Sequence, residues 1–331
     1  MAEGSDHLGP APLDLFGPVA DDLARLESSL LSSIAGDGDP MARPMTELFR
    51  AGGKRVRPAL VFLFASLGGA GHDRLEPAAM AVELTHAATL IHDDVIDRSP
   101  VRRGRPTVVS TLGHPRAIVV ADFYFAKAYR EAGRSGAEVV TLLAEAVMSV
   151  CAGELIQQAA RFHYRTPIEH YLRRIELKTA SLVAASCEIG AVVGGLAPEA
   201  VRAAARYGRD LGLAFQVADD VLDYAGAPVE IGKPVGHDLT QGSATLPLLL
   251  ALQDPVLRPR LATALPEGRE LTAEEAAAVV EMVRSTPATH LARDRARSLA
   301  AAARGSLAEV PAGPVRDCLA NLTTYVVERK L

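Results

Sequence analysis

The sequence predicts an all-α protein built as a single domain. Alanine and leucine dominate its 331 residues, aromatic residues make up only 5%, and tryptophan is absent. Ala and Leu lose little side-chain freedom in a helix, so this composition favours helices over strands. Glycine and proline punctuate the apolar stretches at intervals that suit helices. Thr107–Thr111 could form a strand, but this segment is short and isolated.

The predicted domain runs from residue 13 to residue 331, because no Ser/Gly linker or change in composition divides it. The first 12 residues are polar and rich in Pro and Gly, so we expect a disordered tail. This tail lacks the basic and then apolar plan of a signal peptide. No charge-free apolar run reaches the roughly 18 residues of a membrane span. These features predict a soluble cytoplasmic protein without stable membrane insertion.

The overall charge argues against a nucleic-acid-binding surface. The chain has 35 basic and 40 acidic residues and a formal net charge of −5, whereas nucleic-acid binders usually carry a basic excess. An anionic partner must therefore be bound by a local cluster of cations. The three cysteines, Cys151, Cys187 and Cys318, are widely separated, which fits free thiols in a reducing compartment.

Two predicted helices end in the same acidic pattern. The first runs from Pro77 to the break at Ser99–Pro100, and the second from Pro198 to Gly226. Each carries a D-D-x-x-D set near its C-terminal end, where the helix macrodipole disfavours anions. The first and last Asp of a set lie one turn apart and repel each other. The six carboxylates are Asp93, Asp94, Asp97, Asp219, Asp220 and Asp223.

A bound divalent cation would turn both penalties into attractions. Oxygen-only ligands with open positions suit Mg²⁺, especially when substrate phosphates complete its coordination. One such cluster could be a solvated helix end, but two matching clusters on two apolar helices favour a metal site. His86 shares the helical face of Asp93 and Asp97, which favours a phosphate-binding role over a core role. Gln216 lies just before the second cluster in the same way.

Basic residues follow or precede these clusters along the chain. Arg binds phosphate oxygens through a forked pair of hydrogen bonds, and Lys supplies a compact charge. Each basic run alone is weak support, because such runs are common on surfaces. The candidates to contact phosphate are Lys54, Arg57, Arg102, Arg103, Lys178, Thr179 and Lys233.

Taken together, these motifs resemble those of the trans-isoprenyl diphosphate synthase, or polyprenyl synthetase, family. The matching segments, in the family's order, are GGKRVRP at 52–58, HDDVID followed by RRG, GEL at 153–155, KTASL at 178–182 and FQVADDVLD at 215–223. The resemblance spans residues 52 to 247 and is specific only as a combination. It implies a bundle of antiparallel helices around a deep central cavity, usually in a homodimer.

The resemblance also implies a reaction, in which isopentenyl diphosphate is condensed with an allylic diphosphate with the help of Mg²⁺. The first cluster, with Asp93, Asp94 and Asp97, would bind Mg²⁺ on the allylic diphosphate. The second, Asp219 with Asp220 and Asp223, would hold a further Mg²⁺. The positions that match the isopentenyl diphosphate site are Lys54, Arg57, His86 and Arg103. Those around the allylic diphosphate are Arg102, Lys178, Thr179, Gln216 and Lys233, and Lys178 also counts among the catalytic residues.

The sequence departs from the family pattern in two places. No Lys precedes the T-L-P of residues 242–247, which removes one possible phosphate contact, and Asp122 stands where Gly is usual. Three other classes are disfavoured. A class I terpene cyclase would not need GGKRVRP or a second cluster. A non-catalytic subunit of a heteromeric synthase would be expected to lose the aspartates. A structural helical bundle has no reason to bury six carboxylates.

Small residues along the first helix bear on product length. Ala88 and Thr89 lie one turn before Asp93, and Thr85 and Ala81 continue along that side. One helical turn spans about 5.4 Å, comparable to one isoprene unit. A groove of small residues predicts a long-chain product, beyond farnesyl. Close helix packing also favours Ala, so geranylgeranyl and farnesyl diphosphate remain alternatives.

Replacing Ala88 with Phe or Tyr is expected to shorten the product, because a large ring would block the predicted groove. Chromatography of the lipid product measures its length. An unchanged product length would refute the groove.

Overall fold

The computed structural model is all-α, as predicted, and describes residues 13–39, 41–69, 72–225 and 236–328. The tail expected at residues 1–12 and the candidate Lys233 lie outside the described residues. The helices of the first part are η1 (Leu13–Val19), α1 (Ala20–Ala35), α2 (Ala42–Arg50), α3 (Val56–Ala65), η2 (His72–Arg74), α4 (Leu75–Ile96), α5 (Val108–Leu112) and α6 (His114–Ser135).

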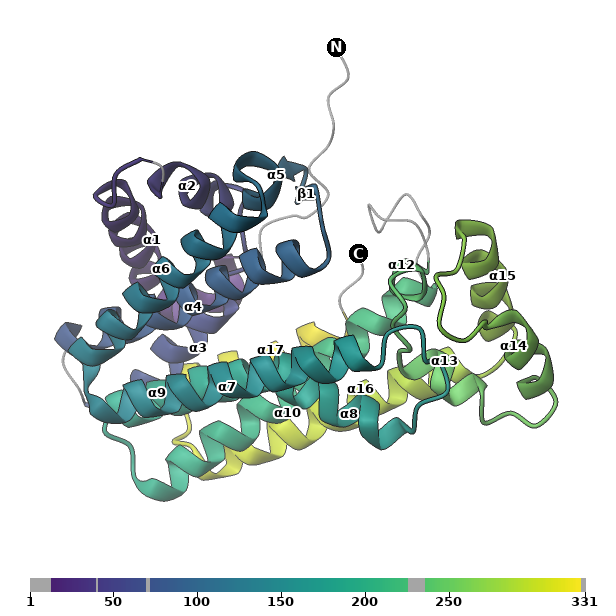
Figure 1. The fold of residues 1–331 in the computed structure, drawn as a ribbon. Coiled ribbons are helices and arrows are strands. Elements are labelled where there is room, and N and C mark those ends of the chain that lie inside the picture. Colours follow the sequence, from purple (N-terminus) through teal and green to yellow (C-terminus); the bar gives the residue numbers. More distant parts are fainter. Residues whose placement is uncertain (1–12, 40, 70–71, 226–235, 329–331) are drawn as a thin grey trace, which may run out of the picture.

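The second part contributes the long helices and the C-terminal region. Its elements are α7 (Ala137–Ala159), α8 (Ile168–Ile175), η3 (Glu176–Ala180), α9 (Ser181–Val193), α10 (Pro198–Ala225), α12 (His237–Thr240), α13 (Leu246–Ala251), α14 (Arg258–Ala264), α15 (Ala273–Arg284), α16 (Ala288–Ser306), η4 (Leu307–Glu309) and α17 (Pro314–Glu328). Figure 1 shows α7, α10 and α16 running lengthwise, with α1–α6 gathered at one end and α12–α15 at the other.

Both predicted aspartate-bearing helices are present, as α4 and α10. The strand considered at Thr107–Thr111 is wrong, because this segment forms α5. Thr107 is its N-cap, and the Thr107 hydroxyl accepts a hydrogen bond from the backbone N–H of Ser110 over 3.1 Å. A side-chain cap of this kind lets a β-branched residue begin a helix.

A short β-hairpin, with two residues in each strand, lies between the first aspartate cluster and α5. Strands β1 (Val101–Arg102) and β2 (Arg105–Pro106) pair antiparallel. Its turn residues, Arg103 and Gly104, have φ of +50° and +72°, the left-handed pair that favours tight hairpins. The turn therefore fixes the direction in which Arg102 and Arg103 leave the backbone.

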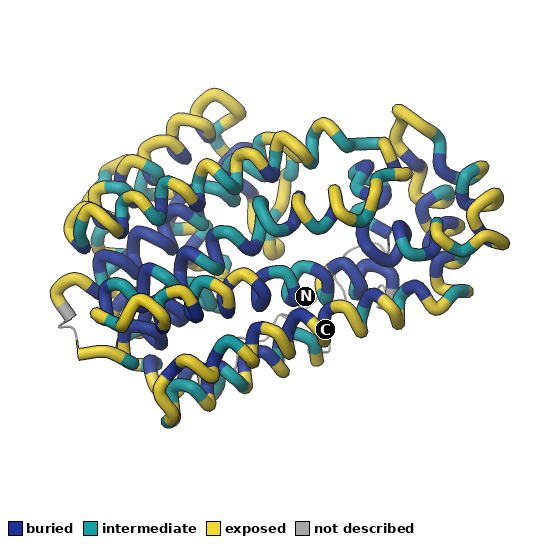
Figure 2. Tube along the Cα trace, turned by 90° about the horizontal axis from the view of Figure 1, so that it is seen from below, coloured by how far each residue is buried: buried dark blue, intermediate teal, exposed yellow. Residues whose placement is uncertain are grey.

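Glycines allow the central helices to approach closely. A Cβ added at Gly190 of α9 would lie 2.4 Å from the carbonyl oxygen of Val61 in α3. One added at Gly212 of α10 would lie 2.7 Å from the Cα of Ala180 in η3. Buried residues line the inner sides of these helices, and exposed ones the outer sides (Figure 2). The segment from η3 to α9 is thus held tightly in the middle of the bundle.

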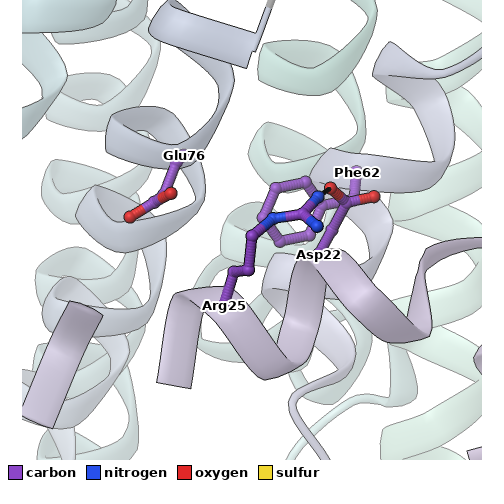
Figure 3. A pocket seen from close by; sticks show the side chains of 4 residues that line it. All are labelled: Asp22, Arg25, Phe62 and Glu76. Atoms are coloured by element: carbon purple, nitrogen blue, oxygen red, sulfur yellow. Dashed lines mark hydrogen bonds and ion pairs between the residues drawn. The ribbon is translucent and has the colours of Figure 1, made fainter. Parts of the chain in front are cut away.

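One pocket lies at the end of α4 that is remote from its aspartates. Its volume is about 420 Å³, and Asp22 and Arg25 of α1 form an ion pair at its edge. Figure 3 shows Glu76 across from this pair and the Phe62 ring behind it. Glu76 lies in the first turn of α4 and Asp93 in its last, about 25 Å away at 1.5 Å per residue. The deep cavity expected beside the aspartates therefore stays a prediction.

Candidate active site

The first aspartate cluster occupies the last turn of α4. Asp94 is only 1% exposed; its Oδ1 accepts a hydrogen bond from Arg102 Nε over 3.0 Å and forms an ion pair with Arg102 Nη2 at 2.9 Å. Burial raises the pKa of Asp94, and the Arg102 guanidinium opposes this rise. Asp97 follows the helix as its C-cap and is exposed. The hairpin thus returns Arg102 to the cluster that precedes it.

Asp93 faces the middle of the bundle. Its Oδ1 lies 3.7 Å from the ammonium of Lys178, which also pairs with Glu154. Burial raises the pKa of Asp93, while the Lys178 charge works against that rise. Lys178 therefore reaches the first cluster from a different helix.

The second cluster is held partly by other protein groups. Asp220 is 2% exposed and accepts hydrogen bonds from the Tyr171 hydroxyl over 2.6 Å and from Gln216 Nε2 over 2.8 Å. Burial, together with the charge of Asp238, raises the pKa of Asp220 to about 8.

The other two carboxylates of this cluster differ in their surroundings. Asp223 accepts hydrogen bonds from the backbone N–H groups of His237 and Asp238, each over 3.1 Å, and so caps α12. Asp219 is exposed. One carboxylate of the second cluster thus points outward while another anchors the chain where it resumes at α12.

A single turn of π-helix, η3, connects the two clusters. Its Thr179 donates a hydrogen bond to Gln216 Oε1 over 2.9 Å, and the adjacent Lys178 contacts Asp93. Gln216 in turn donates to Asp220. Turns of π-helix inside α-helices often occur at functional sites, because the extra residue re-aims side chains. The structure therefore links the two acidic sets through side chains of η3 and Gln216.

A cluster of cations surrounds His86. Arg57 Nη1 lies 3.1 Å from His86 Nε2. Burial and the charges of the neighbouring arginines, first Arg57 and then Arg103, lower the pKa of His86 well below its usual value. The buried Nε of Arg57 has no hydrogen-bond partner. Buried cations of this kind need an anion, which makes this cluster a fit for phosphate oxygens.

Other residues of the GGKRVRP segment have protein partners. Arg55 pairs with Glu83 over 2.7 Å, so its charge is balanced internally. The Lys54 ammonium lies 5.4 Å from the centre of the Tyr325 ring in α17. A Cβ at Gly53 would lie 3.1 Å from Arg103 Nη1, which places Arg103 beside this segment. Phosphate binding by Lys54 stays a prediction.

The acidic donors suit Mg²⁺ shared with a substrate. Asp93, Asp97 and Asp219 retain exposed surface, whereas Asp94 and Asp223 bond to protein groups. Within the described ranges, no three His, Cys, Asp or Glu side chains form a group that could hold a metal ion. Mg²⁺ commonly takes one or two carboxylates and completes its shell with water and phosphate. Metal binding by Asp94 and Asp223 therefore also stays a prediction.

The small-residue stripe on α4 is packed. Ala81 and Ala88 have no exposed surface, and Thr85 is 1% exposed. Thr89 is partly buried and donates a hydrogen bond to the carbonyl of His86 over 2.7 Å. Side chains without exposed surface do not line an open groove, so a substrate tail along this stripe would have to displace packed neighbours. The groove remains a prediction.

Sequence reasoning did not assign two residues that shape this site. Glu154 belongs to the GEL segment, which was recognised without a role. Tyr171 carries no signal in a single sequence, because a tyrosine on an apolar helix face usually belongs to the core.

Comparison with known proteins agrees with the geometry. Residues 39–283 match the family model described as polyprenyl synthetase. The chain is 35% identical over 316 residues to the heptaprenyl diphosphate synthase component 2 of Geobacillus stearothermophilus, covering 95% of this chain and 98% of that protein.

Two solved structures are also similar. A decaprenyl diphosphate synthase from Rhodobacter capsulatus superposes with a TM-score of 0.88 at 33% identity, covering 95% of this chain and 98% of that one. A geranylgeranyl pyrophosphate synthase from Lactobacillus brevis gives 0.88 at 32% identity, covering 96% and 99%.

Replacing His86 with Gln is expected to flatten the dependence of folding stability on pH. Because the folded state lowers the pKa of His86, the unfolded chain binds the extra proton first, below about pH 6.5. The wild type should therefore lose stability as the pH falls from 6.5, by up to about 1.4 kcal/mol per pH unit from this residue. Urea unfolding of the metal-free protein at pH 7.5, 6.5 and 5.5 measures this. The exposed His290 gives a control, H290Q, and equal slopes for H86Q and wild type would contradict the prediction.

Proposed function

This chain belongs to the polyprenyl synthetase family, and from that premise we propose that it is a trans-prenyltransferase that joins isopentenyl diphosphate to an allylic diphosphate. Its product is a polyprenyl diphosphate longer than farnesyl, in keeping with the names of the similar synthases. The observation that carries the proposal is the η3 turn, whose Lys178 contacts Asp93 and whose Thr179 bonds to Gln216, which in turn bonds to Asp220. One allylic diphosphate can then contact both clusters at once.

The allylic diphosphate lies between the clusters in this proposal. Asp93, Asp97 and Asp219 would hold Mg²⁺, and the Lys178 ammonium would contact a phosphate oxygen beside Asp93. When bound there, Mg²⁺ supplies Lewis-acid stabilisation of the negative charge on the leaving diphosphate. The carboxylates of Asp93, Asp97 and Asp219 keep exposed surface, and oxygen ligands of this kind support this choice of ion.

Isopentenyl diphosphate occupies the cationic cluster around His86. Arg57 and Arg103 bring positive charge to this region, and the nearby Glu83 already pairs with Arg55. Burial and the neighbouring arginines lower the pKa of His86, which favours a role as a hydrogen-bonding group over a role as a third charge. Fixed donors of this kind need no rearrangement during reaction.

The chain's own residues then direct the carbon–carbon bond. Lys178 stabilises the diphosphate as the allylic C–O bond breaks, and the allylic carbocation is attacked by the alkene of isopentenyl diphosphate. No described side chain at the site is a convincing general base, so the departing diphosphate takes the proton that the new product loses. Apolar helix faces around the clusters keep water from the cation.

Purified protein with Mg²⁺, farnesyl diphosphate and labelled isopentenyl diphosphate is expected to yield a labelled lipid longer than farnesyl. D93N and D219N should each lower kcat/KM by about 100-fold, because each removes charge that binds the metal-bridged leaving group. D294N is a matched control, since Asp294 is exposed on α16, where it pairs with Arg297. A wild type that forms no such lipid would rule out the proposed reaction.

We also propose that the chain forms a homodimer through α7. Of the described helices, α7 is long and apolar enough to cross a membrane, yet only 28% of its most apolar window is buried. Met148 and Leu155 on this helix are 64% and 71% exposed. Its exposed positions repeat at steps of four and three residues, the spacing of a helix–helix seam: Thr141, Glu145, Met148, Ala152, Leu155 and Ala159. A second copy of α7 would cover this face.

The sedimentation mass of the wild type is expected to be twice the chain mass of 34.9 kDa. M148E should shift the protein to monomer, because a charge would be buried in the seam without a partner. V256E is the control, since Val256 is 82% exposed but lies outside α7. A wild type that sediments as a monomer would exclude the homodimer.

A heteromeric assembly is the second candidate, because one similar protein is named a component of its synthase. That arrangement predicts a chain that elongates substrate only with another protein added. We propose a cytoplasmic location as well, which the free thiols of Cys151, Cys187 and Cys318 support.

A further inference from the structure

A polar stripe runs along one side of the otherwise apolar C-terminal half of α7 and just beyond it. Glu154, Gln158 and Arg161 follow at steps of four and three residues, which places them on one face. Gln158 Nε2 donates to Glu154 Oε1 over 2.6 Å. Arg161 Nε donates to the carbonyl of Gln241 over 3.1 Å, and its Nη1 lies 3.4 Å from Gln158 Oε1. Gln158, itself contacted by Arg161, therefore holds the Glu154 carboxylate in place.

In front of this stripe, Lys178 is held from two sides. Its ammonium pairs with the Glu154 carboxylate and lies 3.7 Å from Asp93 Oδ1. The side chains of Glu154 and Lys178 are 12% and 20% exposed, so water screens this pair less than a surface ion pair. Lysine has a flexible four-carbon stem. Without Glu154, the Lys178 ammonium would lose the partner that selects its rotamer.

The backbone brings these two residues together. A Cβ added at Gly153 would lie 2.5 Å from the backbone nitrogen of Lys178 and 2.9 Å from its Cβ. Only glycine permits such an approach between α7 and η3. The residue after it, Glu154, then faces the side chain of Lys178. This geometry explains why the GEL segment has a glycine followed by a glutamate: the glycine allows the close approach and the glutamate reaches Lys178.

We propose that Glu154 is a positioning residue for the allylic diphosphate. It holds the Lys178 ammonium at Asp93, where a phosphate oxygen of the allylic substrate binds, and Gln158 holds Glu154 in turn. This inference rests on the proposed function. It assigns Glu154 no contact with substrate, so its whole effect passes through Lys178.

The geometry also limits which substrate is affected. Among the described residues, the Glu154 side chain contacts Gln158 and Lys178 and not Arg57, His86 or Arg103, which surround the other proposed diphosphate site. Loss of Glu154 should therefore weaken the binding of the allylic diphosphate and leave the binding of isopentenyl diphosphate unchanged. A purely structural role would affect both substrates together.

A double-mutant cycle tests this dependence on Lys178. The dissociation constant of farnesyl thiodiphosphate, an analogue that ionises slowly, is measured by calorimetry with Mg²⁺ for wild type, E154A, K178A and E154A/K178A. E154A should raise the constant about 10-fold, as for other groups that orient a ligand-binding residue. In the K178A background, E154A should add no further change, because the group it positions is gone.

Three further measurements complete the test. E154Q keeps an oxygen that can accept from Lys178 and should lose less affinity than E154A, and it serves in its place if E154A does not fold. E199A is the matched control, since Glu199 is exposed in the first turn of α10, where it pairs with Arg202 at the opposite end of that helix from its aspartates. The KM for isopentenyl diphosphate should stay at the wild-type value in all Glu154 variants.

Two results would overturn the inference while leaving the proposed function intact. One is an E154A effect of the same size with and without Lys178. The other is an equal loss of binding affinity for the allylic diphosphate and for isopentenyl diphosphate in E154A. Failure of the wild type to bind the analogue would remove the proposed function and this inference together.

Discussion

The position of one ammonium group, that of Lys178, determines how the two acidic ends of α4 and α10 act together. Six carboxylates near two helix C-termini repel one another and the helix dipoles. Lys178 contacts Asp93, and its neighbour Thr179 bonds to Gln216, which bonds to Asp220. Both side chains come from one π-turn held between α7 and α10. These contacts offset part of the repulsion at the centre of the site.

A second constraint is the separation of charges of opposite sign. The acidic clusters lie around η3, whereas the guanidinium groups gather around His86 on the neighbouring part of α3, α4 and the hairpin. Arg102 pairs with Asp94 and so lies at the boundary between the two regions. Such a divided site fits two diphosphates that are bound differently, one through a metal ion and the other directly by cationic side chains.

The sequence alone predicted much of this arrangement, for identifiable reasons. Helical periodicity placed His86, Asp93 and Asp97 on one face, although α4 ends at Ile96, before the predicted break at Ser99–Pro100. The cap at Thr107 was missed because a short β-branched segment reads equally well as a strand. The π-turn was missed because one inserted residue leaves no trace in a periodic pattern. Tyr171 and Glu154 owe their roles to long-range contacts, which a single sequence does not encode.

The capping of α12 by Asp223 has a consequence of its own. The Asp223 carboxylate accepts both backbone N–H groups at the start of this four-residue helix. A helix so short has little stability by itself. Any cation that competes for those oxygens therefore trades its binding free energy against the order of residues 237–240. Occupancy at the end of α10 and the resistance of that short segment to amide exchange or proteolysis are, in thermodynamic terms, linked quantities.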